Sequence, residues 1–109
     1  MKLWIDDVRP APDGYCWVKS VNEARRIIIK EEQFICDPFH NYHPWNIIEL
    51  IDIDHDAGDY ASDGGDYIKL LDWLEETGRN YPIHIHSQNV VGRMNMEAIC
   101  RRNGWTIVK

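Results

Sequence analysis

Positive charge is scarce in this 109-residue sequence: 12 lysines and arginines stand against 18 aspartates and glutamates, which gives a formal net charge of −6. Non-specific binding to a nucleic-acid duplex depends on clustered Lys and Arg side chains that neutralise phosphates. We therefore expect no DNA duplex as a partner. A small nucleotide remains compatible with this charge, because a local basic group or a metal ion is enough to hold it.

Cysteine and long apolar runs are also few. The three cysteines, Cys16, Cys36 and Cys100, are far apart and odd in number, so they match neither a disulfide framework nor a zinc-finger spacing. No apolar stretch approaches the length of a membrane span, and the first residues, MKLWIDDV, carry acids where a signal peptide is apolar. We expect a soluble cytoplasmic protein with reduced thiols and no membrane partner.

Short apolar strands instead alternate with amphipathic helices along what we expect to be one domain, residues 1–109. The pattern predicts strands at 2–5, 15–19, 47–53, 81–87 and 105–108, and helices at 21–32, 66–76 and 93–102. Such alternation predicts an α/β fold, a three-layer αβα sandwich with helices on both faces of a five-stranded parallel sheet. Prolines and an Asp-Gly pair predict a rigid Pro-rich loop in place of a first helix, and residues 34–46 read as a packed loop.

The central strand leads into a cluster of charged residues. Ile51–Gly58 reads IDIDHDAG, so a buried strand ends in Asp54, His55 and Asp56. Open α/β sheets bind ligands outside the carboxyl ends of their strands, and carboxylates held this close favour a cation or a shared proton. On this stretch alone, a solvated acidic turn explains the residues equally well.

Two further strand ends carry polar clusters, and these favour a functional site. Parallel strands bring their carboxyl ends to one edge of the sheet. The three clusters expected to meet there are Asp6 with Asp7, Asp54 with His55 and Asp56, and His86 with Ser87 and Asn89. Each cluster alone has a structural explanation, such as a turn cap or a buried histidine, but solubility alone does not account for three at one edge.

The acids at this edge predict a divalent metal site. Oxygen ligands on Asp6, Asp7, Asp54 and Asp56 suit Mg²⁺. The neighbouring histidines leave Mn²⁺ or Zn²⁺ open as alternatives.

The whole pattern resembles the cyclic-phosphate processing receiver domains. The segments that carry the resemblance are LWIDDVRPAP, IDIDHDAG, a helix led by two glycines, and HIHSQNVVGRMNM, which together span nearly the whole chain. The resemblance implies a receiver-like, flavodoxin-like fold and a phosphoesterase that processes cyclic phosphates. Its ligand would be a small phosphorylated molecule, either a cyclic nucleotide or an RNA end with a 2′,3′-cyclic phosphate.

A catalytic assignment follows from the chemistry that such a reaction needs. His55 and His86 are candidates for general acid and base, because imidazole titrates near neutral pH. Asp54 would contribute to metal binding and catalysis, and Ser87 would supply a hydroxyl. The competing interpretation of His86 is a buried structural residue.

A substrate-binding assignment completes the predicted site. Arg9 and Arg93 would clamp phosphate oxygens with their forked donors, and Asn89 would supply another donor. Gly64 and Gly65 would turn the chain so that amides at the start of the next helix face an anion. For Arg9 and Arg93, a surface salt bridge and a solvated helix start are the plain alternatives.

Three other functions compete with this assignment. In two-component receivers, which the order of Asp6, Asp7, Asp54 and Ser87 also resembles, the central aspartate accepts a phosphoryl group, but here no lysine ends a fifth strand before a further helix. The pairs Asp52-x-Asp54 and Asp54-x-Asp56 mimic the nucleophile pair of a haloacid-dehalogenase-type phosphatase, although that family places its pair after the first strand. A non-catalytic module that binds a cyclic nucleotide would use the same phosphate clamp.

Overall fold

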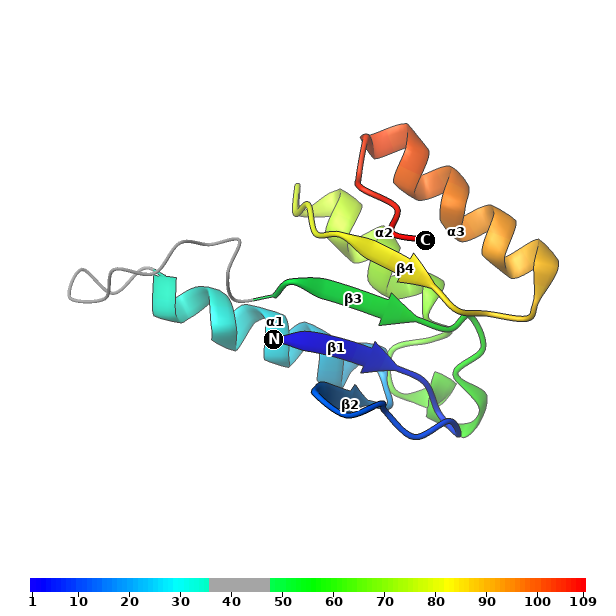
Figure 1. Ribbon diagram of the computed structural model, residues 1–109, viewed down its shortest axis with the longest axis horizontal. Helices are drawn as coiled ribbons and strands as arrows, with labels where there is room; N and C mark the ends of the chain where they lie inside the picture. The colour runs from blue at the N-terminus through cyan, green and yellow to red at the C-terminus, as the bar shows by residue number, and fades with distance from the viewer. Residues whose placement is uncertain (36–47) are drawn as a thin grey trace.

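The computed structural model of the protein describes residues 1–35 and 48–109, which form a parallel sheet and three α-helices (Figure 1). The strands are β1 (Lys2–Ile5), β2 (Tyr15–Val18), β3 (Leu50–Ile53) and β4 (Ile83–Ile85). The helices are α1 (Val21–Ile35), α2 (Ile68–Glu76) and α3 (Val90–Asn103), and a short 3-10 helix, η2 (Gly58–Ser62), precedes α2. The predicted α/β alternation is therefore confirmed.

The sheet has four strands in the order β2-β1-β3-β4, and every pair of neighbours is parallel. The fifth strand predicted at residues 105–108 is reduced to a single parallel bridge between Ile83 and Ile107. The chain leaves α3 at Gly104, which has a φ of 68°. The segment then meets β4 only briefly, where Ile83 N donates to Thr106 O at 2.9 Å and Val108 N donates to Ile83 O at 2.7 Å.

All three helices pack against one face of this sheet, so the three-layer sandwich predicted from the sequence is wrong for the described residues. Figure 1 shows α1 and α2 behind the strands. The buried core joins Leu3, Ile5 and Ile53 of the sheet to residues of every helix, such as Ile28 and Leu71. Because side chains alternate between the two faces of a strand, the remaining strand residues point away from the helices.

We call that opposite side the outer face, and all its strand residues except Leu50 are polar or aromatic. The register places Trp4 between Trp17 on β2 and Asp52 on β3, and pairs Asp52 with His84 on β4. The members of the outer face are Lys2, Trp4, Tyr15, Trp17, Leu50, Asp52 and His84. None of them belongs to the hydrophobic core cluster.

The segments that join the elements complete the description. Residues 6–14, between β1 and β2, form bends and turns and contain no helix. The predicted packed loop at residues 34–46 lies outside the described residues, except that α1 extends to Ile35. Among the described helices, none has both the length and the apolar character that a membrane span requires.

Candidate functional site

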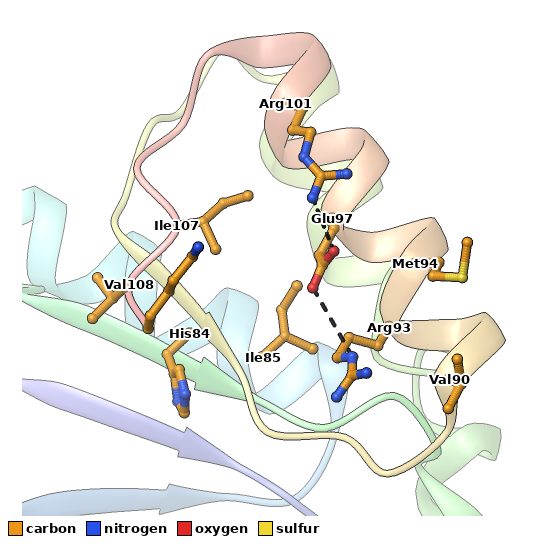
Figure 2. A pocket seen from close by; sticks show the side chains of 10 residues that line it. His84, Ile85, Val90, Arg93, Met94, Glu97, Arg101, Ile107 and Val108 are labelled. Atoms are coloured by element: carbon orange, nitrogen blue, oxygen red, sulfur yellow. Dashed lines mark hydrogen bonds and ion pairs between the residues drawn. The ribbon is translucent and has the colours of Figure 1, made fainter.

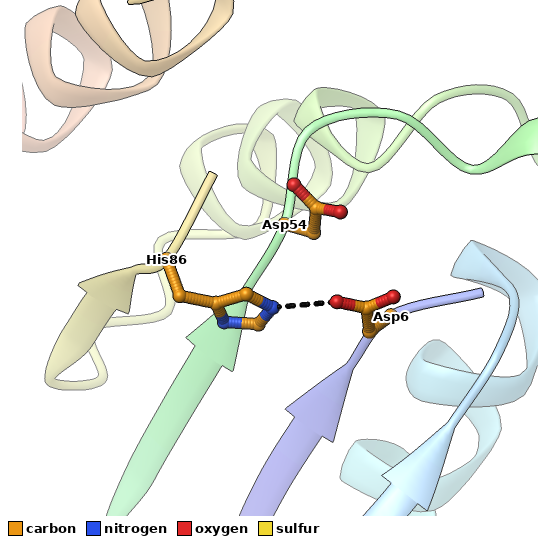
Figure 3. Close-up of side chains that lie close together, drawn as sticks. All are labelled: Asp6, Asp54 and His86. Carbon is orange, nitrogen blue, oxygen red and sulfur yellow. Dashed lines mark hydrogen bonds and ion pairs between the residues drawn. The ribbon is translucent and has the colours of Figure 1, made fainter. Parts of the chain in front are cut away.

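Three neighbouring strands bring acidic and imidazole side chains together at their carboxyl ends (Figure 3). Asp6 follows β1, Asp54 follows β3 and His86 follows β4. One ligand atom from each of these side chains lies within 4.8 Å of the others. The convergence that the sequence predicted at this edge is therefore present for these three residues.

His86 is held between two carboxylates. Its Nδ1 lies 2.6 Å from Oδ1 of Asp52 and its Nε2 lies 2.9 Å from Oδ2 of Asp6. The ring of Trp4 stacks on the imidazole at a centroid distance of 3.9 Å and an interplanar angle of 2°. Burial alone would lower the pKa of His86, but the hydrogen bonds to Asp52 and Asp6 outweigh it and raise that pKa above its usual 6.5. His86 is therefore favoured as an imidazolium that donates to both carboxylates.

The two acids after β1 differ in their surroundings. The Asp6 side chain is fully buried, and its Oδ1 accepts hydrogen bonds from the amides of Val8 and Arg9 at 3.0 and 2.9 Å. Burial opposes ionisation, yet these amides and His86 lower the pKa of Asp6. Burial and the nearby charges of Asp6 and Asp54 instead raise the pKa of Asp7. Asp6 is thus the charged partner of His86, whereas Asp7 lies outside the group of three.

Asp52 and His84 belong to this network, although the sequence analysis gave them no role in the preferred site. Asp52 is 5% exposed, and its Oδ1 also lies 2.8 Å from Nδ1 of His84. A signal was available, since both residues interrupt apolar strands and stand opposite each other in the register. An aspartate inside an apolar strand, with histidines on the next strand, marks a buried polar pair.

His55 and Asp56 form a second group beside the first. Nδ1 of His55 lies 2.9 Å from Oδ1 of Asp56, and the amide nitrogen of Asn89 lies 3.5 Å from the same imidazole nitrogen. The hydrogen bond from His55 lowers the pKa of Asp56. The imidazole also packs on α3, because a Cβ at Gly92 would lie only 2.4 Å from Cγ of His55. Asp56 therefore orients His55, and it is not part of the Asp6–Asp54–His86 group.

Ser87 and Asn89 shape the start of α3. The hydroxyl of Ser87 accepts a hydrogen bond from Asn89 N at 3.1 Å, and Oδ1 of Asn89 caps the helix by accepting from Gly92 N at 3.0 Å. The Ser87 side chain is buried under this turn. In both bonds the side chain accepts, whereas the donor group of Asn89, Nδ2, lies 3.4 Å from Oδ2 of Asp56.

The two predicted phosphate clamps lie in different places. Arg9 is at the site, where its Nη1 donates to His86 O at 3.5 Å. Arg93 lines a separate pocket of about 530 Å³ between β4, α3 and the last residues of the chain (Figure 2). Its Nε lies 4.0 Å from Oε1 of Glu97, which also pairs with Arg101. Of the two arginines, the structure brings only Arg9 to the three-residue group.

The glycine pair is engaged in packing. Gly64 has a φ of 111°, and a Cβ there would lie 2.8 Å from Cβ of Val21 at the start of α1. The amide of Gly65 donates to Ala61 O at 2.8 Å, and the amide of Tyr67 donates to His55 O at 3.1 Å. These amides are already occupied by backbone acceptors, so the glycines fix the loop between β3 and α2.

The donor set at the sheet edge fits a divalent cation. Two carboxylates and one imidazole are common ligands of Mn²⁺ and Zn²⁺, and the carboxylates also suit Mg²⁺. The second imidazole nitrogen of His86 faces Asp52, which is the arrangement that orients metal-bound histidines in proteins. The residues present therefore fit a metal at Asp6, Asp54 and His86, without distinguishing among these three ions.

A family model described as "Cyclic-phosphate processing Receiver domain" matches residues 1–102 of the chain. No curated protein and no solved structure shows significant similarity to the chain.

Proposed function

The chain belongs to the cyclic-phosphate processing receiver family, and from that membership we propose that it hydrolyses a cyclic phosphodiester to a phosphomonoester. In this reaction an oxygen from water forms a new bond to phosphorus, one P–O ester bond of the ring breaks, and a proton passes to the released alkoxide. The observation that carries the proposal is the group of Asp6, Asp54 and His86 at the carboxyl end of the sheet. For ring opening of a cyclic phosphate, this group would supply a general acid and charge stabilisation, and the neighbouring His55 would supply the base.

His86 is suited to give a proton to the leaving oxygen. The hydrogen bonds to Asp52 and Asp6 raise the pKa of His86, which favours the protonated imidazole, and they fix the ring by both nitrogens. A general acid works best when its pKa lies close to the operating pH. The Nε2 proton is directed at Oδ2 of Asp6, so a leaving oxygen would have to take the place of that carboxylate oxygen to receive it.

His55 is suited to take a proton from water. Asp56 binds Nδ1, which favours the tautomer with its proton on that nitrogen and leaves the Nε2 lone pair available. Within the described part of the chain, no protein group occupies that Nε2. Arg9, beside His86, would bind an anionic phosphoryl oxygen and position the ring.

A divalent cation held by Asp6, Asp54 and His86 would polarise the phosphoryl group and lower the pKa of water. Ligation requires His86 to lose its Nε2 proton, while Asp52 keeps the proton on Nδ1. A cation at His86 and a general-acid proton on His86 are therefore alternatives for the same nitrogen. If the cation is present during turnover, the proton for the leaving oxygen must come from another group.

The test is turnover of a 2′,3′-cyclic mononucleotide followed by ³¹P NMR, with and without added Mn²⁺ or Mg²⁺. We expect His86→Asn and Asp54→Asn to lower kcat by about a hundredfold or more, the usual loss for a general acid, base or charge-stabilising group. Asp59→Asn is the matched control, because Asp59 is exposed in the same loop and its side chain makes no described contact with the site. Parent-rate turnover by Asp54→Asn and His86→Asn would refute the proposed site.

A receiver-type switch is the second candidate, and the observation that favours it is the position of Asp54 beside Asp6 at the end of β3. In that case Asp54 would accept a phosphoryl group and no cyclic phosphate would be consumed. Incubation with acetyl phosphate and mass spectrometry distinguish the two functions. A phosphoryl adduct on Asp54 without turnover would replace the hydrolase, and binding of cyclic nucleotide with neither result would indicate a non-catalytic module.

A further inference from the structure

Three aromatic side chains gather on the outer face, away from all the helices. Trp4 lies on β1 and Tyr15 and Trp17 lie on β2, with Trp4 and Trp17 paired in the register. The rings of Trp4 and Tyr15 meet edge to face at 5.9 Å. Since these rings do not take part in the hydrophobic core, packing against the helices does not account for them.

Lysines cover the rings of β2. Nζ of Lys2 lies 5.5 Å from the centre of the Tyr15 ring, and Nζ of Lys19 lies 4.4 Å from the centre of the Trp17 ring. Neither lysine forms an ion pair with a described carboxylate, although the chain as a whole carries a net charge of −6. Lys2 is exposed, whereas Lys19 is half-buried and its Nζ also lies 6.0 Å from the centre of the Tyr60 ring. Cation–ring contacts near a surface are weak, so both ammonium groups can turn toward a phosphate and uncover the rings.

The aromatic group is continuous with the candidate site. Trp4 stacks on His86, and the indole nitrogen of Trp17 donates to the backbone oxygen of Asp6 at 2.8 Å. The indole nitrogen of Trp4 donates to Arg9 O at 2.9 Å. A chain that enters the site at its phosphate end would therefore run on to Trp17 and Tyr15.

We propose that the outer face of β1 and β2 binds single-stranded RNA, whose 3′-terminal cyclic phosphate occupies the site at Asp6, Asp54 and His86. This inference rests on the proposed function and names its substrate class: an oligoribonucleotide end rather than a free cyclic mononucleotide. Aromatic rings on an open sheet accept bases of any sequence by stacking, and nearby cations bind the backbone. Tyr15 and Trp17 supply the rings, and Lys2 and Lys19 supply the charges.

The same residues fit a protein partner less well. The buried centres of protein–protein interfaces are depleted of lysine, whereas here lysines lie directly over the aromatic rings. A positive charge beside each ring suits a nucleic acid strand, in which every base is attached to a phosphate. A double helix is excluded by the few cations available, since only a short strand is held by two lysines.

Binding of a fluorescein-labelled pentauridylate with a 3′-phosphate, the expected type of product, tests the proposal without requiring turnover. We expect Trp17→Leu and Tyr15→Leu each to weaken binding by about tenfold in fluorescence anisotropy, the usual effect of removing one stacking ring. Leucine keeps most of the apolar bulk, and two separate variants guard against the failure of one to fold. Met94→Ala is the matched control, because Met94 is an exposed apolar residue on α3, and it should leave binding unchanged.

Salt dependence tests the lysines separately. For single strands, each neutralised phosphate adds about 0.7 to the slope of log affinity against log salt concentration. Lys2→Gln and Lys19→Gln should each lower that slope by about this amount. Lys30→Gln, which removes an exposed charge from α1, should not change it.

The outcomes separate this inference from the proposed function. If a cyclic mononucleotide is hydrolysed, but pentauridylate binding does not respond to Trp17→Leu or Tyr15→Leu, RNA binding by the outer face is refuted and the hydrolase function is supported. If pentauridylate binding is weakened by Trp17→Leu and Tyr15→Leu, but no cyclic phosphate is hydrolysed, RNA binding by the outer face is supported and the hydrolase function is refuted. Sedimentation that shows self-association of the protein, lost in Trp17→Leu, would assign the outer face to a second copy of the chain and overturn the proposal.

Discussion

At the scale of single residues, the site is defined by one imidazole between two carboxylates. Asp52 and Asp6 each take one nitrogen of His86, and Trp4 holds the plane of the ring. Such a histidine has two stable states: an imidazolium that donates at both nitrogens, or a neutral ring whose Nε2 lone pair binds a cation. Protons and divalent cations should therefore compete for the same nitrogen atom.

In the metal-free protein, the contribution of His86 to the free energy of unfolding should decrease as the pH rises. Its pKa is raised in the folded state, so its contribution to the free energy of unfolding is complete below the unfolded pKa, near 6.5. That contribution disappears as the pH passes through the higher folded pKa. Urea unfolding in EDTA, at half-unit steps from pH 6 to pH 9, should show this decline in the parent protein.

His86→Gln is the matched variant for this measurement, because glutamine keeps hydrogen-bonding capacity and does not titrate. The difference in unfolding free energy between the parent and His86→Gln should shrink as the pH rises. A constant difference across the whole range would mean that His86 is neutral in the folded protein. The carboxylates of Asp6, Asp52 and Asp54 remain in both proteins, so their effects largely cancel.

At the scale of elements, the sequence predicted the ends of the strands better than their interiors. Asp6, Asp54 and His86 could be placed together because an apolar run that stops at a charged residue marks the carboxyl end of a strand. Asp52 and His84 received no role in the preferred site, since a polar residue inside a strand shows its partner only once the register is known. Arg93 was associated with the site because it follows β4 closely, but α3 carries it into a separate pocket.

Gly92 is the point at which α3 determines the position of His55. Alanine is favoured over glycine inside a helix by about 1 kcal/mol, so Gly92→Ala should raise stability if nothing opposed it. A Cβ at this position would approach Cγ of His55 to 2.4 Å, and the imidazole would have to leave Asp56. We expect the melting temperature to change little while kcat for the cyclic phosphate falls by about tenfold or more, as reacting groups move out of alignment.

Val91→Ala is the control for the helix substitution, because Val91 is 69% exposed on the same turn. It should change neither kcat nor the contact between His55 and Asp56. ¹H–¹⁵N spectra of the imidazole nitrogens report that contact directly. A Gly92→Ala protein with parent kcat and a displaced His55 would remove His55 from the mechanism.

At the scale of the whole molecule, the three-layer architecture was predicted from the alternation of strands and helices, which does not specify the face of the sheet that each helix covers. Strands that read KLWI and YCWV also contain apolar or aromatic residues at alternate positions on both faces, so their composition did not reveal the uncovered face. The structure shows that Trp4, Tyr15 and Trp17 all share the outer face, where ring–ring and ring–cation contacts replace a covering helix. The hydrophobicity of an aromatic residue does not by itself distinguish a side chain that packs in the core from one that lies on a surface able to bind a ligand.

Stability of the whole molecule should report the predicted metal, because a ligand that binds only the folded state stabilises it. At a Mn²⁺ concentration of about a hundred times Kd, the gain is about 2.7 kcal/mol, which raises the melting temperature of a domain of this size by roughly ten degrees. Asp54→Asn should abolish the rise, because Asp54 is one of the three residues whose ligand atoms converge.

The variant Asp56→Asn distinguishes the metal site predicted from the sequence from the metal site indicated by the structure. The sequence assigned Asp56 to the metal together with Asp6, Asp7 and Asp54, whereas the structure turns its side chain, 62% exposed, toward His55. We therefore expect Asp56→Asn to keep the full rise in melting temperature with Mn²⁺ while it lowers kcat through His55. If Asp56→Asn loses the rise as completely as Asp54→Asn does, the cation is held by the loop after β3, and His86 is left to act as a proton donor alone.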